Sequence, residues 1–139
     1  MNALAKLFLI INGIILITYG LVFLINPTIL GRLVGFTYNN SNAMIEVMAF
    51  YGGLKIGIGC FFIWCAFDDN RHKMALAAFT IIFLATGIAR GIGYLQFGDE
   101  DPIQLIISGI ELSFCLFAFC LHTIVPFFQK KAAYNSSVY

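Results

Sequence analysis

The sequence predicts an all-α integral membrane protein, a four-helix bundle with up-down topology. Hydrophobic residues make up 60% of the 139 residues and charged residues only 11%, which is too little polar surface for a soluble domain. Four apolar stretches are each long enough for the about 20 residues with which a helix crosses a bilayer. The connections between them are short, so the chain has room for one transmembrane domain over residues 1–139 and no extramembrane domain.

Hydropathy places the membrane helices at about residues 5–26, 43–67, 74–97 and 103–125. Pro27 ends the first helix, and the segment 29–38 mixes apolar residues with one arginine and two glycines. We expect that segment to lie in the outer interface rather than to cross the membrane. Polar segments 68–73 and 98–102 connect the later helices, and residues 126–139 should form a cytoplasmic tail.

Lysine and arginine are distributed unevenly between the two sides of this layout. One side carries Arg32 together with the acidic segment 99–101. The other side carries the remaining extramembrane cations, Lys6, Arg71, Lys73, Lys130 and Lys131. Because cytoplasmic loops are enriched in lysine and arginine, both termini should be cytoplasmic.

Apart from Lys6 at the start of the first span, four charged residues lie inside the predicted spans: Glu46, Lys55, Arg90 and Glu111. Each costs about 2.5 to 3.5 kcal/mol at a bilayer centre, so such residues pair, line a cavity or take part in chemistry. Arg90 lies on a helix that runs outward, and its side chain leans inward, away from the nearer interface. Its guanidinium is best satisfied by Glu111, by Glu46 or by both.

The helix faces favour this pairing. On the fourth helix a polar-to-small stripe recurs at spacings of three and four, through Gln104, Ser108, Glu111, Cys115, Ala118 and His122. The second helix places on one face Glu46, Phe50, Gly53, Gly57, Cys60 and Trp64. The first helix aligns Asn12, Tyr19 and Asn26. Each helix therefore has one face suited to a neighbouring helix.

Glycines should let these helices approach closely, through Gly53-x-x-x-Gly57 on the second helix and Gly87-x-x-x-Gly91 on the third. Lys55 does not fit the scheme, because nine residues from Glu46 is two and a half turns. It points away from Glu46 unless the pair Gly52-Gly53 bends the helix.

No metal, cofactor or nucleic-acid site is expected. Four cysteines lie in the spans without a C-x-x-C pair, and we interpret them as small apolar fillers. His72 and His122 lack the companions that a metal site needs. The net charge of +1 and the absence of a basic patch argue against nucleic acid as a partner. No nucleophile and base with an orienting third group are present, so an enzyme is the less favoured class.

An ordered set of residues resembles a known family over roughly residues 43–125. Its elements are Glu46, the run Tyr51-Gly52-Gly53 with Gly57 and Gly59, the run Ala89-Arg90-x-x-Gly93, and Glu111. This order and spacing is similar to the small bacterial membrane proteins of domain of unknown function 4345. The resemblance implies a four-helix fold in a bacterial inner membrane and a shared Glu, Tyr-Gly-Gly, Arg, Glu core, and it brings no known activity.

Two interpretations of the buried charges remain open: an ion pair that fixes helix register, and a site for a ligand or a proton. The candidate cluster comprises Glu46, Arg90, Glu111, Tyr19 and Tyr51. The candidate packing glycines are Gly52, Gly53, Gly57, Gly87 and Gly91.

We favour a non-enzymatic role. The chain would bind a lipophilic or small polar ligand in an outer-leaflet cavity, or act as an accessory subunit of a larger membrane complex. The alternatives are a small transporter or proton-relay protein and, less favoured, a membrane enzyme acting on a lipophilic substrate. Beyond the lipid bilayer, the partners would be that ligand, the larger complex or further copies of the chain.

Overall fold

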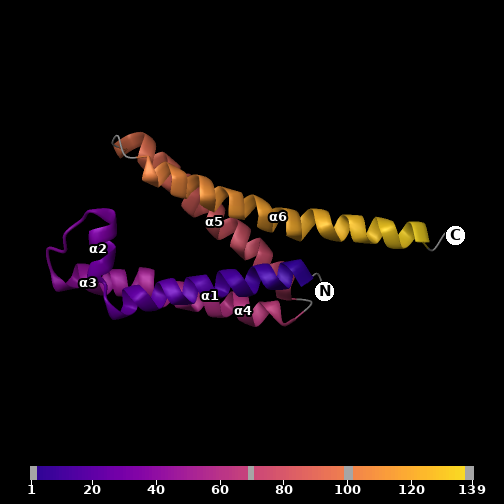
Figure 1. The fold of residues 1–139 in the computed structure, drawn as a ribbon, viewed down its shortest axis with the longest axis horizontal. Coiled ribbons are helices and arrows are strands. Elements are labelled where there is room, and N and C mark those ends of the chain that lie inside the picture. The colour runs from indigo at the N-terminus through magenta and orange to yellow at the C-terminus, as the bar shows by residue number, and fades with distance from the viewer. Residues whose placement is uncertain (1–2, 69–70, 99–101, 137–139) are drawn as a thin grey trace. The chain divides into compact units, whose positions relative to one another are not determined.

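The computed structural model describes residues 3–68, 71–98 and 102–136, with side chains through residue 123. Its described residues form helices and no strand, as Figure 1 shows. Four segments are long and apolar enough to cross a membrane: Ala3–Ile25, Ser41–Ala66, Arg71–Phe97 and Ile103–Thr123. The prediction of an all-α protein with four such segments is therefore confirmed, with bounds that differ from the expected ones by at most three residues.

Large apolar side chains remain exposed along these segments. In a soluble protein, apolar exposure on this scale would mark an interaction surface or an aggregation hazard. In a membrane protein the same side chains face lipid, where exposing apolar surface carries none of the free-energy cost that it has in water. Examples from α1 and α5 are Leu7, Ile11, Ile14, Ile15, Ile81, Leu84 and Ile88.

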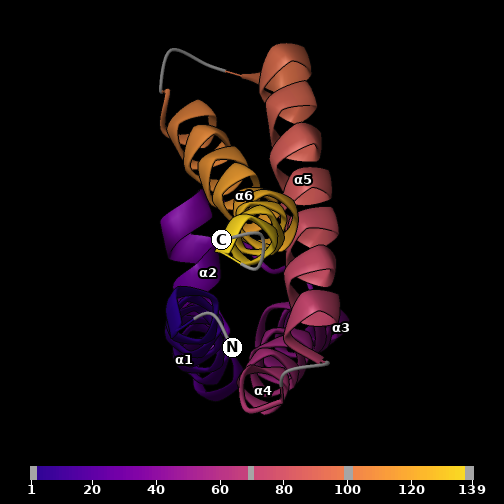
Figure 2. The same cartoon turned by 90° about the vertical axis from the view of Figure 1, so that its right-hand side faces the viewer.

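The chain divides into two compact units, Met1–His72 and Lys73–Tyr139. The first unit contains α1 (Ala3–Ile25), α2 (Thr28–Val34), α3 (Ser41–Val47), the π-helix η1 (Met48–Gly53) and α4 (Leu54–Ala66). The second contains most of α5 (Arg71–Phe97) and all of α6 (Ile103–Ser136). Each unit is thus a hairpin of long helices, and Figure 2 shows α1 beside α4 and α5 beside α6.

Glycines bring α1 and the α4 segment into close contact. A Cβ atom on Gly59 would lie 2.6 Å from the Gly13 carbonyl oxygen, and one on Gly20 would lie 2.7 Å from the Gly52 carbonyl oxygen. Gly13 and Gly20 are seven residues apart, about two turns, so they share one face of α1. Gly52 at the end of η1 and Gly59 on α4 both lie against that face. At both places the backbones of the two helices are in contact, at a separation that a residue larger than glycine would not permit.

The segment between Val47 and Leu54 departs from the expected regular helix. Met48–Gly53 form a π-helix, in which the Leu54 N–H donates to the Ala49 carbonyl five residues earlier. Such a wide turn breaks the 3.6-residue periodicity, so residues before and after it no longer follow one face. The predicted common face from Glu46 to Trp64 is therefore wrong as an uninterrupted helical stripe.

The packing glycines of this segment also differ from the expected pair. Gly52 faces α1, where an added Cβ would lie 3.1 Å from the Leu24 Cβ. An added Cβ on Gly53 would meet only the Met48 carbonyl, at 3.9 Å, and one on Gly57 would meet nothing within 4 Å. Within the described part of the first unit, the close approach thus uses Gly52 and Gly59 in place of Gly53 and Gly57.

The connection after α1 is folded rather than open. The short helix α2 follows Pro27 and ends at Gly35, which has a positive φ of 83° and donates its N–H to the Gly31 carbonyl at 2.8 Å. The Tyr38 hydroxyl donates to the Pro27 carbonyl. Ile29 and Tyr38 pack against a buried cluster of Phe23, Leu30 and Val47. This packing holds the segment 29–38 against the ends of α1 and α3, and its place in the membrane interface stays a prediction.

Helix α6 extends further than the sequence predicts. The helix continues through Pro126 to Ser136, where a tail was expected from residue 126. Gln129, Lys130, Lys131, Ala132 and Ala133 all have high helix propensity, which accounts for the extension. The span expected at 103–125 agrees with the apolar segment Ile103–Thr123, and the tail expected after it is helical through Ser136.

The predicted connections 68–73 and 98–102 lie partly outside the described residues, which omit 69–70 and 99–101. Asp68 is described, and it accepts a hydrogen bond from the Arg71 N–H at 3.2 Å. It also forms an ion pair with the Arg71 guanidinium at 2.7 Å. Both contacts stabilise the first turn of α5, whose N–H groups lack helical partners.

Candidate functional site

An ion pair joins α5 and α6 inside the second unit. The Arg90 Nε donates to Glu111 Oε2 at 3.2 Å, and Nη2 donates to Glu111 Oε1 at 3.2 Å. Two parallel bonds from a planar guanidinium to one carboxylate form a fork, the geometry that fixes both charge and orientation. Of the two carboxylates considered for Arg90, the structure places Glu111 on it.

A third residue completes the group. The Gln104 Oε1 accepts a hydrogen bond from Arg90 Nη1 at 2.8 Å. Gln104 precedes Glu111 by seven residues, about two helical turns, so both side chains leave α6 on the face toward α5. Gln104 belongs to the polar stripe predicted for this helix but not to the predicted site residues. Its seven-residue spacing from Glu111 is the signal that could have identified it.

Small residues hold the two helices close at this level. The buried Ser108 hydroxyl donates to the Gly87 carbonyl at 2.8 Å. An added Cβ on Gly87 would lie 2.9 Å from the Leu112 side chain, and one on Gly91 would lie 3.5 Å from the Ser108 Oγ. Gly87 is therefore a position of close approach, whereas Gly91 makes an ordinary contact. Both glycines lie within one turn of Arg90, and these contacts fix the position of Arg90 along the axis of α6.

The polar stripe of α6 faces α5 along several turns. The Cys115 thiol donates to the Thr80 carbonyl with a 3.4 Å separation. Ser108, Cys115 and Ala118 are all buried, as is Leu121 nearby. Together with the Gln104 and Glu111 contacts, these observations show that the spacing of three and four identified the interior face of this helix.

The ion pair is accessible in part. The side chain of Arg90 is 35% exposed and that of Glu111 is 17% exposed. An arginine has five N–H donors, and three of those on Arg90 are used by Glu111 and Gln104. Within the described part of the second unit, one N–H on Nη1 and one on Nη2 therefore remain for another acceptor.

The other candidate residues belong to the first unit. Tyr19 and Tyr51 each contact the buried Phe23 ring edge to face, with centroid distances of 4.5 Å and 6.3 Å. Glu46 lies on α3 with an exposed side chain. The structure thus joins Arg90 to Glu111 in one unit and Tyr19 to Tyr51, through Phe23, in the other. A single cluster of all five residues stays a prediction.

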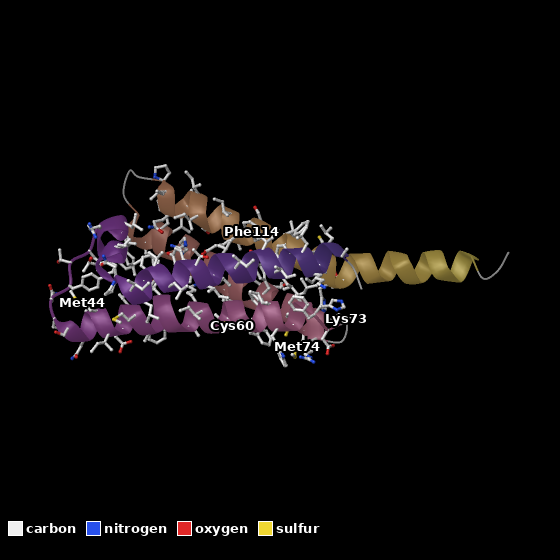
Figure 3. All side chains as sticks on the ribbon, turned by 60° about the horizontal axis from the view of Figure 1, so that its bottom comes forward. Met44, Cys60, Lys73, Met74 and Phe114 are labelled. Atoms are coloured by element: carbon white, nitrogen blue, oxygen red, sulfur yellow. The ribbon has the colours of Figure 1, made fainter. Side chains whose placement is uncertain are left out.

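The remaining titratable and metal-binding residue types form no further centre in the described ranges. No group of three or more His, Cys, Asp and Glu side chains able to hold a metal ion occurs among the residues that were described. All four cysteines are free thiols. Cys65 and Cys115 are buried, and Cys60 is exposed on α4, where Figure 3 labels it. Lys55, the charge without an assigned role, is half-buried on α4.

Comparison with known families relates the chain to one family whose function is unknown. The family model described as "Domain of unknown function (DUF4345)" matches residues 4–122. No curated protein and no solved structure matches the chain. The matched range covers most of the chain and includes every candidate site residue. The chain therefore belongs to the DUF4345 family of domains of unknown function.

Proposed function

We propose that this chain is a non-enzymatic membrane protein that binds a lipophilic ligand at the group formed by Arg90, Glu111 and Gln104. The observation that carries the proposal is an oriented guanidinium with unused donors. Glu111 and Gln104 hold Arg90 in one position, while two N–H groups have no acceptor among the described residues of the second unit and about a third of the side chain is exposed. A fixed donor costs little ordering entropy when a ligand binds.

The surroundings favour a ligand that enters from lipid. Exposed apolar side chains lie at the level of the group on both helices, Ile88 and Ile92 on other faces of α5 than Arg90, and Leu112 on α6. The group itself lies within two segments long and apolar enough to cross a membrane. A molecule with an apolar body and one polar group would match this combination of a few polar contacts in an apolar wall.

We place the protein in the bacterial inner membrane as an up-down four-helix bundle with both termini cytoplasmic, which would put the group in the outer leaflet. Two contacts in the first unit support one positive side. The Lys6 ammonium lies 4.7 Å from the Phe67 ring centroid, and the Arg71 guanidinium lies 4.2 Å from the Trp64 ring centroid. These cation–π contacts hold Lys6 and Arg71 at one end of the α1–α4 hairpin. Cations at that end are what a cytoplasmic side requires.

Cysteine labelling tests this orientation. In a variant whose four native cysteines are alanine, a cysteine introduced at Glu100 should react with a membrane-impermeant maleimide in intact cells. A cysteine at Asn70 should react only after the cells are permeabilised, because the positive side should be cytoplasmic. The reverse pattern of labelling would contradict the proposed orientation.

Ligand retention tests the proposed function. Wild-type protein purified in detergent should retain a lipophilic molecule that native mass spectrometry detects as an adduct. The double variant Arg90→Leu with Glu111→Leu should lose most of that adduct, because the oriented donors are gone while the apolar volume remains. The variant Arg32→Ala, which removes an exposed arginine of α2, should retain it as a matched control.

Two outcomes would count against the ligand proposal. Equal adducts on the wild type and the double variant would show that the molecule binds elsewhere. Absence of any adduct, combined with stoichiometric assembly of the protein into one defined membrane complex, would favour the accessory-subunit alternative.

A further inference from the structure

We infer that the polar group of the ligand is an uncharged oxygen acceptor, such as the carbonyl of a ketone, quinone or ester, and not a carboxylate, sulfonate or phosphate. This inference rests on the proposed function, since it names the chemistry of the ligand for the same site. The charges and the unused donors of the second unit carry it.

The charge balance comes first. The Glu111 carboxylate already neutralises the Arg90 guanidinium through a two-bond fork. An anion added to this pair would give the site a net negative charge in an apolar medium, where the desolvation penalty is several kcal/mol per ion. It would also stand near the Glu111 carboxylate and be repelled by it. A neutral acceptor avoids both effects.

The unused donors give a positive reason. The guanidinium keeps one free N–H on Nη1 and one on Nη2 within the described second unit. Each of these N–H groups needs a hydrogen-bond acceptor, and neither can donate to a cation or to an apolar group. A carbonyl oxygen has two lone pairs and can accept from one or both.

Gln104 shows what kind of acceptor this arginine takes besides its carboxylate. Its amide oxygen, an uncharged carbonyl, lies 2.8 Å from Arg90 Nη1, closer than either carboxylate contact at 3.2 Å. A ligand carbonyl would repeat this interaction on the remaining donors.

Competition between two probes tests the inference. Heptadecan-2-one labelled with ¹³C at the carbonyl would be bound to the protein in dodecyl maltoside, a detergent without carbonyl groups. The carbonyl resonance should shift on binding to the wild type and should not shift with the Arg90→Leu, Glu111→Leu variant. Hexadecane-1-sulfonate, which stays ionised, should displace the ketone only at concentrations about tenfold higher than unlabelled ketone requires, given the penalty for an added anion.

The variant Glu111→Gln tests whether the charge of Glu111 sets the preference for an uncharged ligand. This variant leaves Arg90 positively charged and keeps an uncharged acceptor opposite it. The site should then prefer the anion to the carbonyl. The sulfonate should therefore displace the labelled ketone at lower concentrations than unlabelled ketone does. Displacement of ketone from the wild type by equal or lower sulfonate concentrations would overturn the inference and leave the ligand site standing. Failure of both probes to bind the wild type would instead count against the proposed function.

Discussion

Replacing Arg90 or Glu111 alone by alanine should destabilise the protein in detergent more than replacing both by leucine. Each single change leaves a charge in the contact between α5 and α6 without the fork that now satisfies it. Stranding a buried charge costs about 3 to 5 kcal/mol, whereas replacing a whole buried pair by apolar residues is often neutral. Because Arg90 is 35% exposed, we expect the loss for Glu111→Ala near the lower end of that range.

Thermal unfolding of the solubilised protein, followed by circular dichroism, measures this difference. Arg32→Ala serves as the control, since Arg32 is exposed and its guanidinium donates a long hydrogen bond of 3.4 Å to the Thr28 hydroxyl. Its midpoint should stay close to that of the wild type. A double leucine variant destabilised as much as the two single alanine variants taken together would mean that Arg90 and Glu111 do not stabilise each other, and the proposed site would lose its basis.

Gly59→Ala should destabilise the first unit strongly, whereas Gly57→Ala should not. A Cβ on Gly59 would lie 2.6 Å from the Gly13 carbonyl oxygen and 2.7 Å from Ile17 Cγ1. The first neighbour is backbone and cannot rotate away, so the helices must separate. Overpacking of this kind costs about 1 to 3 kcal/mol. Gly57, two residues away on the same helix, has open space around an added Cβ.

The two variants form a matched pair, because both add one methyl group to α4. Gly57→Ala should even gain up to about 1 kcal/mol from helix propensity. Unfolding midpoints in detergent measure the difference, and Gly20→Ala on α1 should resemble Gly59→Ala. Equal midpoints for Gly57→Ala and Gly59→Ala would contradict the described glycine contact between α1 and α4.

The interior face of α6 was predictable because its signal is local. Residues at spacings of three and four share a helix face wherever the helix is regular, and Gln104, Ser108, Glu111 and Cys115 all contact α5 as that rule requires. The pairing of Arg90 with some carboxylate followed from the cost of an isolated charge in an apolar medium. The choice of Glu111 did not follow, because Glu46 satisfied the same rule.

The glycine contact of the first unit was not predictable in the same way. Gly53 and Gly57 form the more familiar motif, but the contact with α1 uses Gly52 and Gly59. The π-helix Met48–Gly53 intervenes between the two ends of this segment. A single wide turn changes which residues face a neighbour, and hydropathy carries no sign of it because no residue of this turn is charged.

The sequence by itself determined that the chain is all-helical and has four segments able to cross a membrane. These properties depend on composition and on the length of apolar runs, which a bilayer constrains directly. The tertiary structure alone decided which glycines meet, that Gln104 joins Arg90 and Glu111, and that two donors of Arg90 stay unused among the described residues of the second unit. Those features depend on how far one helix is rotated about its axis and shifted along it relative to its neighbour. Side-chain packing sets both quantities to within about an ångström, and a pattern of residue types does not specify them that finely.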